Sequence, residues 1–548
     1  MVLESGDTVG GVWAKERLYP GLRSNNLLGT YEYSDFPMDS DVFGVKKGEH
    51  IPGEVTHRYL QAYAEEFGIY SKIRFRSKVE IIEKKDDQGW LLTYDTRAEV
   101  KSRIFARKLI LATGAFSEPF MPEFEGVESF GTPLFHSKEM AVKQEKIIGA
   151  KSVAVLAGSK SGYDAVYMAA SRGVEVDWII RASGRGAIWT APPYVTPLKR
   201  WLEKLVNTRF CTWFSPCSWG DADGFGSVRR FLHETRVGRW IVDSFWKILG
   251  NDVLRLNNYD GHPETKKLKP WTDAFWSGSS FSILNYPTNF YDLVREGKIR
   301  VHVSDISHLS PGTVNLSNKE SIKCDALICA TGWKGFPPIK FLPEGIENEG
   351  GILNKIPGIC ELDGKAFLAG ARIYQQFPRL LKRPTVNNPY IEAEERDIKH
   401  TKETHATTTR TIPFRLYRHM APPSLMNEHN IGFAGMVSNF SSLTCAQIQA
   451  LWLTAYLDGK LPGKTTRVSY NAAFHSEFGR IRYPFGSRTN PDFVFDLIPY
   501  LDWLLGDLGL KVHRKPHLLA ECFFSYGPED YRGIVEEWQA LARDRNDM

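Results

Sequence analysis

Residues 153–181 read VAVLAGSKSGYDAVYMAASRGVEVDWIIR, and this stretch decides the fold. It opens with an apolar run at 153–156, whose length and branching are typical of a buried parallel strand. A turn of small residues follows, and then a helical pattern that ends before Gly173, a residue type favoured just beyond a helix C-terminus. Residues 174–180 supply a second apolar strand. The stretch therefore predicts one βαβ unit, with a turn at the end of its first strand that is small enough to approach a phosphate group.

The turn departs from the dinucleotide fingerprint G-x-G-x-x-G, because only its third position keeps a glycine. Small side chains still let the backbone approach a pyrophosphate at the helix N-terminus, where free N–H groups favour an anion. We expect a cofactor to contact Ala157, Ser159, Lys160, Ser161 and Gly162, with Lys160 adding positive charge. The alternative is a βαβ unit that packs with a short turn and binds nothing.

Two arginines follow the second strand. Arg181 ends it and Arg185 lies just beyond, where an acidic residue would select NAD. Basic residues at this place favour the 2′-phosphate of NADP. The sequence therefore predicts that the βαβ unit binds NADPH.

Length and composition bound the class of protein. A chain of 548 residues predicts two or three domains, and 42% hydrophobic with 24% charged residues is typical of a soluble globular protein. A net charge of +5 without a dense basic run argues against nucleic-acid binding. The aromatic share of 13% indicates large apolar surfaces or a roomy pocket for an organic substrate. The seven cysteines show no metal-ligand spacing and predict reduced thiols, and acidic residues interrupt the apolar stretch 493–510, so we expect a cytoplasmic protein without a transmembrane segment.

The first residues resemble the end of a strand that finishes in an acidic residue, Glu4. In a nucleotide-binding domain such an acid bonds the ribose hydroxyls and lies ~20 residues after the glycine turn. No strand and no glycine turn precede Glu4 in this sequence. Taken alone, Glu4 is better interpreted as a surface carboxylate, but the glycine pair and tryptophan that follow it favour a ligand role.

The order of several motifs resembles that of the flavin-containing monooxygenases, in particular the FAD-dependent enzymes of fungal secondary-metabolite clusters. Residues 10–13, GGVW, are similar to the family's GG-x-W. Residues 130–137, FGTPLFHS, are similar to its F-x-G-x-x-x-H sequence, with Thr132 in place of a glycine and Met140 in place of the final aromatic residue. The other matches are ATG at 112–114 and ATGW at 330–333, which resemble the links between nucleotide domains, and QIQALW at 447–452, which resembles the helix that closes the FAD domain.

The resemblance implies an α/β protein with two dinucleotide-binding, Rossmann-like domains. The FAD-binding domain would be split between 1–148 and 323–473, and the NADPH-binding domain would span 149–322. A helical insertion is expected at 189–291, notably over 227–249, and a helical C-terminal region at 474–548. The family's first strand and its G-x-G-x-x-G turn precede the ribose acid, so the FAD domain is expected to lack both.

The resemblance also implies the chemistry. NADPH would reduce FAD, and the reduced flavin would form a C4a-hydroperoxide with molecular oxygen and oxygenate a small hydrophobic secondary metabolite, polyketides being one such class. Hydroxylation, epoxidation and Baeyer–Villiger insertion all stay open, and so does the oligomeric state. The alternative is a flavin-free remnant that binds NADPH or a partner without catalysis, which the missing first turn would favour.

The resemblance assigns site residues one by one. Counted back from Asp35-Phe36-Pro37, Asn25 matches the family's active-site asparagine, whose amide would donate a hydrogen bond to the peroxide oxygens and orient NADP⁺; the alternative for Asn25 is a turn or cap role. His136 is expected to join the domains rather than act as an acid or base. The further residues expected to bind cofactor are Glu4, Gly10, Gly11, Trp13, Thr331, Gly332, Gly435 and Gln447.

Overall fold

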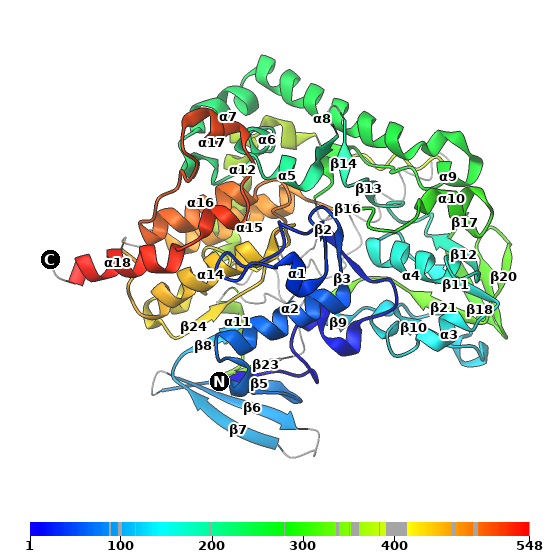
Figure 1. Ribbon diagram of the computed structural model, residues 1–548, viewed down its shortest axis with the longest axis horizontal. Helices are drawn as coiled ribbons and strands as arrows, with labels where there is room; N and C mark the ends of the chain where they lie inside the picture. The colour runs from blue at the N-terminus through cyan, green and yellow to red at the C-terminus, as the bar shows by residue number, and fades with distance from the viewer. Residues whose placement is uncertain are drawn as a thin grey trace.

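A computed structural model describes residues 1–86, 89–96, 101–114, 117–196, 199–278, 280–335, 339–349, 351, 361–382, 384–390, 414–462, 467–485 and 491–546. Figure 1 shows a parallel sheet with its helices on one side of the molecule and a small antiparallel sheet at its foot. Helices from the middle and the end of the chain form the rest. The fold is the mixed α/β architecture that the sequence predicts.

The βαβ unit forms the middle of a five-stranded parallel sheet. It consists of β11 (Ser152–Leu156), α4 (Lys160–Ala170) and β12 (Glu175–Ile180). The strand order is β10-β21-β11-β12-β17, and every neighbouring pair is parallel. The outer strands are β10 (Leu134–His136), β21 (Ala326–Cys329) and β17 (Ile299–Val303). Because β10 and β21 lie outside 149–322, this sheet extends beyond both of the expected domain boundaries.

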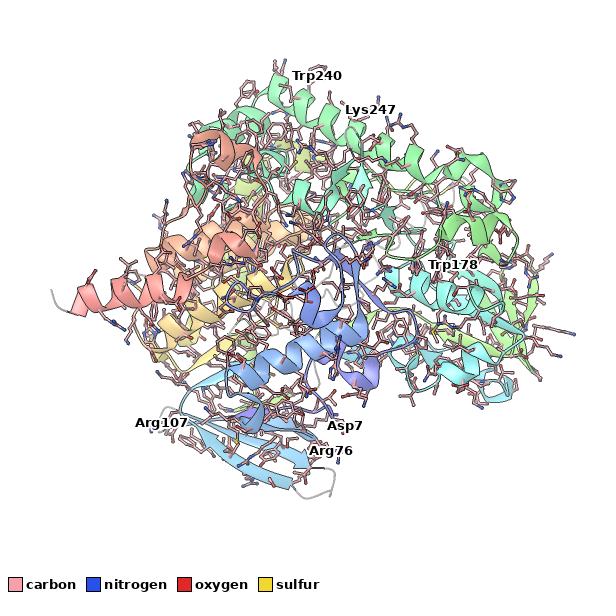
Figure 2. All side chains as sticks on the ribbon, in the orientation of Figure 1. Asp7, Arg76, Arg107, Trp178, Trp240 and Lys247 are labelled. Carbon is pink, nitrogen blue, oxygen red and sulfur yellow. The ribbon has the colours of Figure 1, made fainter. Side chains whose placement is uncertain are left out.

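The packing of the unit explains its residue types. The side chains of 153–156 are almost fully buried, and so is Trp178, which lies among the strands and helices of this half in Figure 2. A Cβ atom added at Gly162 would lie 2.2 Å from the Cβ atom of Ala157, so only glycine lets α4 approach β11 this closely. The third glycine of the dinucleotide fingerprint has the same role, which is close packing of helix on strand.

Strands from both ends of the chain pair in the other half. β8 (Leu109–Leu111) pairs in parallel with β24 (Ile431–Phe433). β23 (Lys340–Leu342) adds to an antiparallel sheet of β5 (Ser77–Lys85), β6 (Gly89–Thr96) and β7 (Lys101–Ala106). Strands from early and late in the chain thus pair with one another in this half, and the split at 1–148 and 323–473 stays a prediction.

Shorter elements complete the strands and the first helices. Two pairs near the N-terminus are β1 (Val2–Leu3) with β4 (Ile73–Arg74), and β2 (Arg23–Leu27) with β3 (His50–Pro52). The remaining elements are α1 (Ser40–Phe43), α2 (Gly53–Glu66), α3 (Gln144–Ile148), β9 (Glu118–Pro119) with β22 (Trp333–Lys334), β13 (Trp189–Ala191) with β16 (Phe281–Ile283), β14 (Tyr194–Val195) with β15 (Arg200–Trp201), β18 (Ile306–Ser310), β19 (Thr313–Leu316), β20 (Ser321–Lys323) and α11 (Ile346–Glu349).

The insertion is helical, as expected, but residues 227–249 are divided between two helices. α7 (Gly226–Glu234) ends where α8 (Arg236–Asn257) begins, because Thr235 is extended and its hydroxyl accepts a hydrogen bond from Gly238 N at 2.9 Å. Figure 2 shows Trp240 and Lys247 projecting outward from α8. The other insertion helices are α5 (Leu202–Val206), α6 (Arg209–Thr212), α9 (Pro263–Lys266) and α10 (Phe290–Arg295).

The late part of the chain is also helical. Its elements are α12 (Glu361–Gln376), α14 (Ser442–Leu457), α15 (Val468–Arg482), α16 (Leu497–Leu508), α17 (Leu518–Phe523) and α18 (Ile534–Asn546). Aromatic rings of the insertion, among them Trp219, Trp246 and Trp276, are buried with these helices in one large core. Much of the aromatic content therefore serves packing. Within the described ranges, no helix has the length and apolar character needed to cross a membrane.

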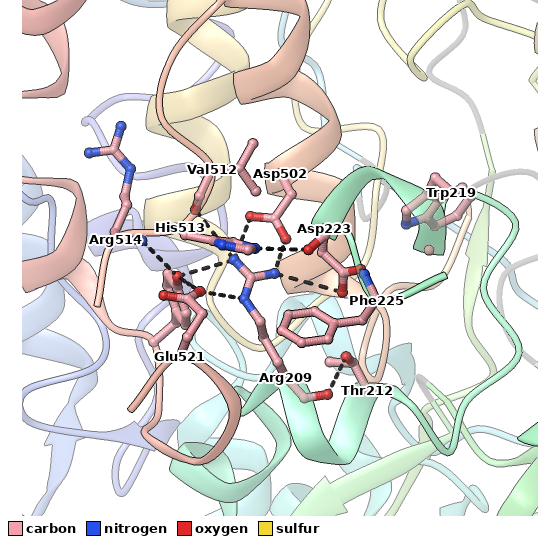
Figure 3. Close-up of polar contacts among 12 residues, drawn as sticks. Arg209, Thr212, Trp219, Asp223, Phe225, Asp502, Val512, His513, Arg514 and Glu521 are labelled. Carbon is pink, nitrogen blue, oxygen red and sulfur yellow. Dashed lines mark hydrogen bonds and ion pairs between the residues drawn. The ribbon is translucent and has the colours of Figure 1, made fainter. Parts of the chain in front are cut away.

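A buried ion network joins the insertion to the C-terminal helices (Figure 3). The Arg209 side chain is fully buried, and its Nε atom donates to Glu521 Oε1 at 2.5 Å. Its other nitrogens donate to both carboxylate oxygens of Asp502 and to the Tyr526 hydroxyl. Burial raises the pKa of Asp502 to about 6, and the guanidinium of Arg209 opposes that rise. The network leaves little freedom between α6, α16 and α17.

The contact between α4 and β11 predicts opposite effects of one substitution at two helical glycines. Gly162→Ala is expected to destabilise the fold by about 1–3 kcal/mol, because the new methyl group overlaps Ala157. Gly506→Ala on α16 meets nothing within 4 Å and is expected to stabilise by up to about 1 kcal/mol. Urea unfolding followed by circular dichroism measures both. Equal effects of the two substitutions would contradict the packing argument.

The ion network predicts a large cost for removing its cation. Arg209→Ala is expected to destabilise the protein by about 3–5 kcal/mol, because Asp502 and Glu521 then keep buried charges without a partner. The control is Arg230→Ala, since Arg230 and Asp221 form an exposed pair at 3.5 Å that contributes little. Thermal unfolding of both variants tests this, and a melting temperature of the Arg209 variant equal to that of the control would be inconsistent with it.

Candidate functional site

The carboxyl ends of β11 and β21 form the first part of the site, where the chain leaves the middle of the sheet in two directions. α4 begins directly after β11, and its N-cap residue Ser159 makes no capping hydrogen bond. The Ser159 hydroxyl instead donates to Ala330 O at 3.4 Å, across the ends of the two strands. The first N–H groups of a helix have no partner within it, so this turn is suited to an anion.

The loop that carries the predicted arginines lies against the same turn. A Cβ atom on Gly158 would lie 2.6 Å from Gly186 O, so the two backbones are in close contact. Arg181 follows the last residue of β12 with an exposed side chain, and it makes no ion pair with any residue in the described ranges. Arg185 stacks over the Phe485 ring at 4.9 Å. The loop that Arg181 begins therefore lies against the turn, and the Arg185 guanidinium lies on an aromatic ring.

Lys160 is placed differently from the expectation. Its ammonium donates to Asp164 Oδ1 at 2.5 Å, to Asn285 Oδ1 at 2.7 Å and to the Tyr286 hydroxyl at 3.0 Å. Burial lowers the pKa of Lys160, and the neighbouring Asp164 carboxylate opposes this. Instead of a free positive charge at the turn, Lys160 forms a half-buried ion pair, because the helix places Asp164 one turn after Lys160.

Strand β2 carries Asn25 and is held on one side by the lysine cluster. Asn285, which binds the Lys160 ammonium, donates from Nδ2 to Arg23 O at 2.7 Å and to Ser24 O at 3.2 Å. Side chains alternate along the strand, so that Ser24 is buried while Asn25 points to the opposite face and is half-buried. The Asn25 amide makes no hydrogen bond to the part of the chain that the structure describes. An asparagine in a turn or cap would bond its own backbone, and this one does not.

The other side of β2 is held by the helical insertion. Asn26 donates from Nδ2 to the carboxylate of Glu203, on α5, and to Phe440 O at 2.8 Å. Glu203 is fully buried, and burial raises its pKa to about 7 against the opposing hydrogen bonds that it accepts. Asn25 is therefore an unpaired amide on a strand that is fixed at both of its neighbours.

The glycine pair adjoins this strand through a tyrosine. Gly10 and Gly11 both have positive φ angles, of 111° and 58°, so the turn favours glycine at each position. Trp13 follows, and its Nε1 donates to the Tyr31 hydroxyl at 3.0 Å. The Ser442 hydroxyl, at the start of α14, donates to the same oxygen at 3.3 Å. Tyr31 thus brings the glycine pair and the N-terminus of α14 together.

Glu4 lies at the end of β1, as the sequence predicts. Its Oε1 atom accepts hydrogen bonds from Gly6 N at 2.7 Å and from the Ser5 hydroxyl. Glu16, which the sequence did not single out, accepts from Asp7 N at 2.9 Å and from the Thr8 hydroxyl at 2.7 Å. The two carboxylates shape the loop that leads to the glycine pair, and a ribose contact of Glu4 stays a prediction.

Two residues of α14 face the site region with unsatisfied polar atoms. Gln447 accepts from Ser34 N at 3.1 Å through its Oε1, while its buried Nε2 has no partner in the described residues. The buried hydroxyl of Thr444, one helical turn earlier, has none there either. Gly435 has a φ of 71° and donates from N to Gln449 Oε1. Buried polar atoms without a partner in the protein indicate a polar ligand or water at this helix.

The second crossing between the domains is fixed by His136. Its Nδ1 atom accepts from Lys138 N at 3.1 Å, so Nε2 carries the proton and donates to Gly332 O at 3.0 Å. Burial lowers the pKa of His136 and keeps the ring neutral. The Thr331 hydroxyl donates to Phe120 O at 2.6 Å. The geometry is that of a histidine joining two segments, as expected, and Thr331 and Gly332 are held in the same crossing.

Three residues that organise this region were missed by sequence reasoning. Glu203 reads as a solvated acid at the start of a short helix, and Asn285 and Tyr31 lie in stretches without a recognisable pattern. Each acts through a contact with a segment far away in the sequence. No local signal could have found them.

Comparison with known proteins gives the same family. A family model described as pyridine nucleotide-disulphide oxidoreductase matches residues 34–210. The chain is 30% identical to the FAD-dependent monooxygenase resA of Aspergillus sclerotiorum, covering 100% of this chain and 95% of that protein. It is 32% identical to a FAD-dependent monooxygenase of Pyrenophora dematioidea, covering 95% of each.

A solved structure supports the fold. The S-allyl-L-cysteine S-oxygenase of Allium sativum superposes with a TM-score of 0.51 at 14% identity, covering 100% of this chain and 88% of that one. A likeness at this identity concerns the fold alone. On the sequence relationships, which span almost the whole length of both proteins, the chain belongs to the FAD-dependent monooxygenases.

Proposed function

We propose that this FAD-dependent monooxygenase takes its electrons from NADPH and oxygenates a small hydrophobic organic molecule. The observation that carries the proposal is the position of Asn25. Its amide has no hydrogen-bond partner in the described residues, and its strand is bonded on one side to Lys160 after the nucleotide turn, through Asn285, and on the other to the insertion, through Glu203.

The residues on the Tyr31 side fit FAD. The turn at Gly10 and Gly11 has backbone without side chains. Gln447 and Thr444 each have a buried polar atom with no hydrogen-bond partner in the described residues. When bound, FAD supplies hydride acceptance and oxygen activation, which no side chain of the protein can supply. The protein's own residues position the reactants. The Asn25 amide would donate a hydrogen bond to the reacting oxygen and orient NADP⁺.

The residues at the end of β11 fit NADPH. The unpaired guanidinium of Arg181 offers a charged donor for a 2′-phosphate, and the N-terminus of α4 offers N–H groups for a pyrophosphate. The family supports catalysis over the flavin-free alternative, which no contact in the described residues favours. For the substrate, the proposal rests on the family resemblance and on the insertion, which reaches the strand of Asn25.

The cofactor assignment predicts a preference for NADPH over NADH. Arg181→Ala is expected to raise the NADPH KM by about 10-fold or more and to leave the NADH KM unchanged, because one charge-assisted phosphate contact is lost. The matched control is Arg172→Ala, at the other end of α4, which should change neither KM. Steady-state rates and equilibrium titration with NADP⁺ measure this. Equal use of both nucleotides by the unmodified enzyme would sink the assignment.

The role of Asn25 predicts that its substitution increases the release of hydrogen peroxide; the rate of this release without organic substrate is called the leak rate below. Asn25→Ala is expected to be reduced by NADPH as before but to release hydrogen peroxide on the order of 10–100-fold faster when no organic substrate is added, because a positioned donor is lost. The control is Asn251→Ala, an exposed asparagine on α8. Peroxide assays and the flavin absorption spectrum measure the change. An unaltered spectrum together with an unaltered leak rate would return Asn25 to a structural role.

A further inference from the structure

Glu203 is a carboxylic acid in the protein interior, where an ionised acid lowers the stability of the fold. It comes from α5 of the insertion, is fully buried, and has no cation within ion-pair distance in the described residues. Its carboxylate accepts from the Asn26 side chain and, through Oε2, from Leu27 N at 3.4 Å. An uncompensated buried carboxyl destabilises a fold unless hydrogen bonds satisfy it, so a purely structural contact would be served better by an amide.

The two donors that Glu203 satisfies belong to the residues directly after Asn25. Asn285 binds the two carbonyl groups directly before it. Asn26 also donates to Phe440 O, which ties the same strand to the segment that leads into α14. The Asn25 side chain makes no hydrogen bond in the described part of the chain, so the contacts of its two neighbours hold the backbone that carries it.

We propose that Glu203 is a positioning residue, which fixes the direction of the Asn25 amide by holding Asn26 and Leu27 from the helical insertion. The inference rests on the proposed function, since it takes Asn25 to be the group that faces the reacting oxygen. This role links the insertion to the reaction, because a displacement of α5 would be transmitted to the strand of Asn25 through the Glu203 carboxyl group.

The surroundings of Glu203 make its charge sensitive to pH. The polar groups around it are the side chains of Asn26 and Thr30 on the β2 side, Leu27 N, and Trp201 on β15. The titratable neighbour is the Tyr31 phenol, whose own pKa is raised by burial and further by Glu203. Lys204, the nearest cation in the sequence, lies over the Trp201 ring instead. No described charge therefore offsets the desolvation of this carboxyl.

The sign of the pH effect follows from the raised pKa. The folded state keeps a proton on Glu203 up to about pH 7, whereas the unfolded chain loses it near the ordinary value of 4.5. Stability is therefore highest below that ordinary value and falls as the pH rises through about 7. Above about pH 7 the ionised carboxylate can accept hydrogen bonds from both the Asn26 amide and Leu27 N. It then holds the backbone next to Asn25 more firmly, while the folded state is less stable.

The test compares four forms of the holoenzyme between pH 6 and 9: the unmodified protein, Glu203→Ala, Glu203→Gln and the control Glu234→Gln, an exposed acid on α7. Glu203→Ala is expected to speed peroxide release on the order of 10-fold without changing the NADPH KM, because only the direction of Asn25 is disturbed. Glu203→Gln keeps one acceptor and should restore most of the coupling. It should also abolish any inflection near pH 7 in both the leak rate and the melting temperature, which the control retains.

A double variant separates this inference from the proposed function. If Glu203 acts through Asn25, adding Glu203→Ala to Asn25→Ala should change the leak rate by less than about 2-fold. The inference would be overturned if the fold-changes in leak rate of the two single variants multiplied in the double variant. It would also be overturned if a folded Glu203→Ala protein had the leak rate and flavin spectrum of the unmodified enzyme. Either result would leave the proposed function intact. If Asn25→Ala alone has no effect, the proposed role of Asn25 falls first, and this inference with it. Should Glu203→Ala fail to fold, an unchanged pH profile in Glu203→Gln decides against the proposal.

Discussion

The bond from Asn285 to the carbonyl groups of β2 is the contact on which the arrangement of the site depends. Asn285 is itself held by the ammonium of Lys160, at the start of the helix that ends the nucleotide turn. Three segments far apart in the sequence are thereby fixed by two side chains. The half-buried ammonium has three side-chain partners, Asp164, Asn285 and Tyr286, so it is held in one position. The turn after β11 and the strand of Asn25 are therefore held in a fixed relative position, although they belong to different sheets.

The second constraint is the burial of charge between the insertion and the C-terminal helices. Arg209 places its guanidinium between Asp502 and Glu521, so three elements depend on one side chain. Buried ion pairs contribute little net stability but strongly disfavour arrangements that separate them. The insertion is accordingly tied at both ends of its first helices, to β2 through Glu203 and to α16 and α17 through Arg209. The insertion is thus built into the body of the protein.

The features that could be predicted from the sequence are those that depend on residues close together in the chain. The βαβ unit follows from hydrophobic periodicity and the joining role of His136 from the family resemblance, and the structure has both. Gly162 was expected to contact a cofactor, and its packing against Ala157 was not foreseen. Sequence reasoning failed where a side chain chooses between partners. Lys160 was expected to add positive charge at the turn, and its bonds to Asp164 and Asn285 were not foreseen. Glu203 was not singled out, since an acid beside a lysine on a short helix looks solvated until β2 is packed against it. The helix break at Thr235 was missed because one hydroxyl decides it.

The pairing of β8 with β24 has a consequence for how the chain is made. The central strands of the nucleotide sheet, β11 and β12, are neighbours in the sequence and can pair as soon as they are synthesised. β8 is made earlier, yet its parallel partner comes from near the end of the chain, after the whole insertion. Contacts of such long sequence separation form slowly, since a large loop must close before they contribute. The half that holds β11 and β12 can therefore fold on the ribosome before β24 is available to pair with β8. In that interval β8 exposes an unpaired strand edge, which is the stage at which this protein would most need a chaperone.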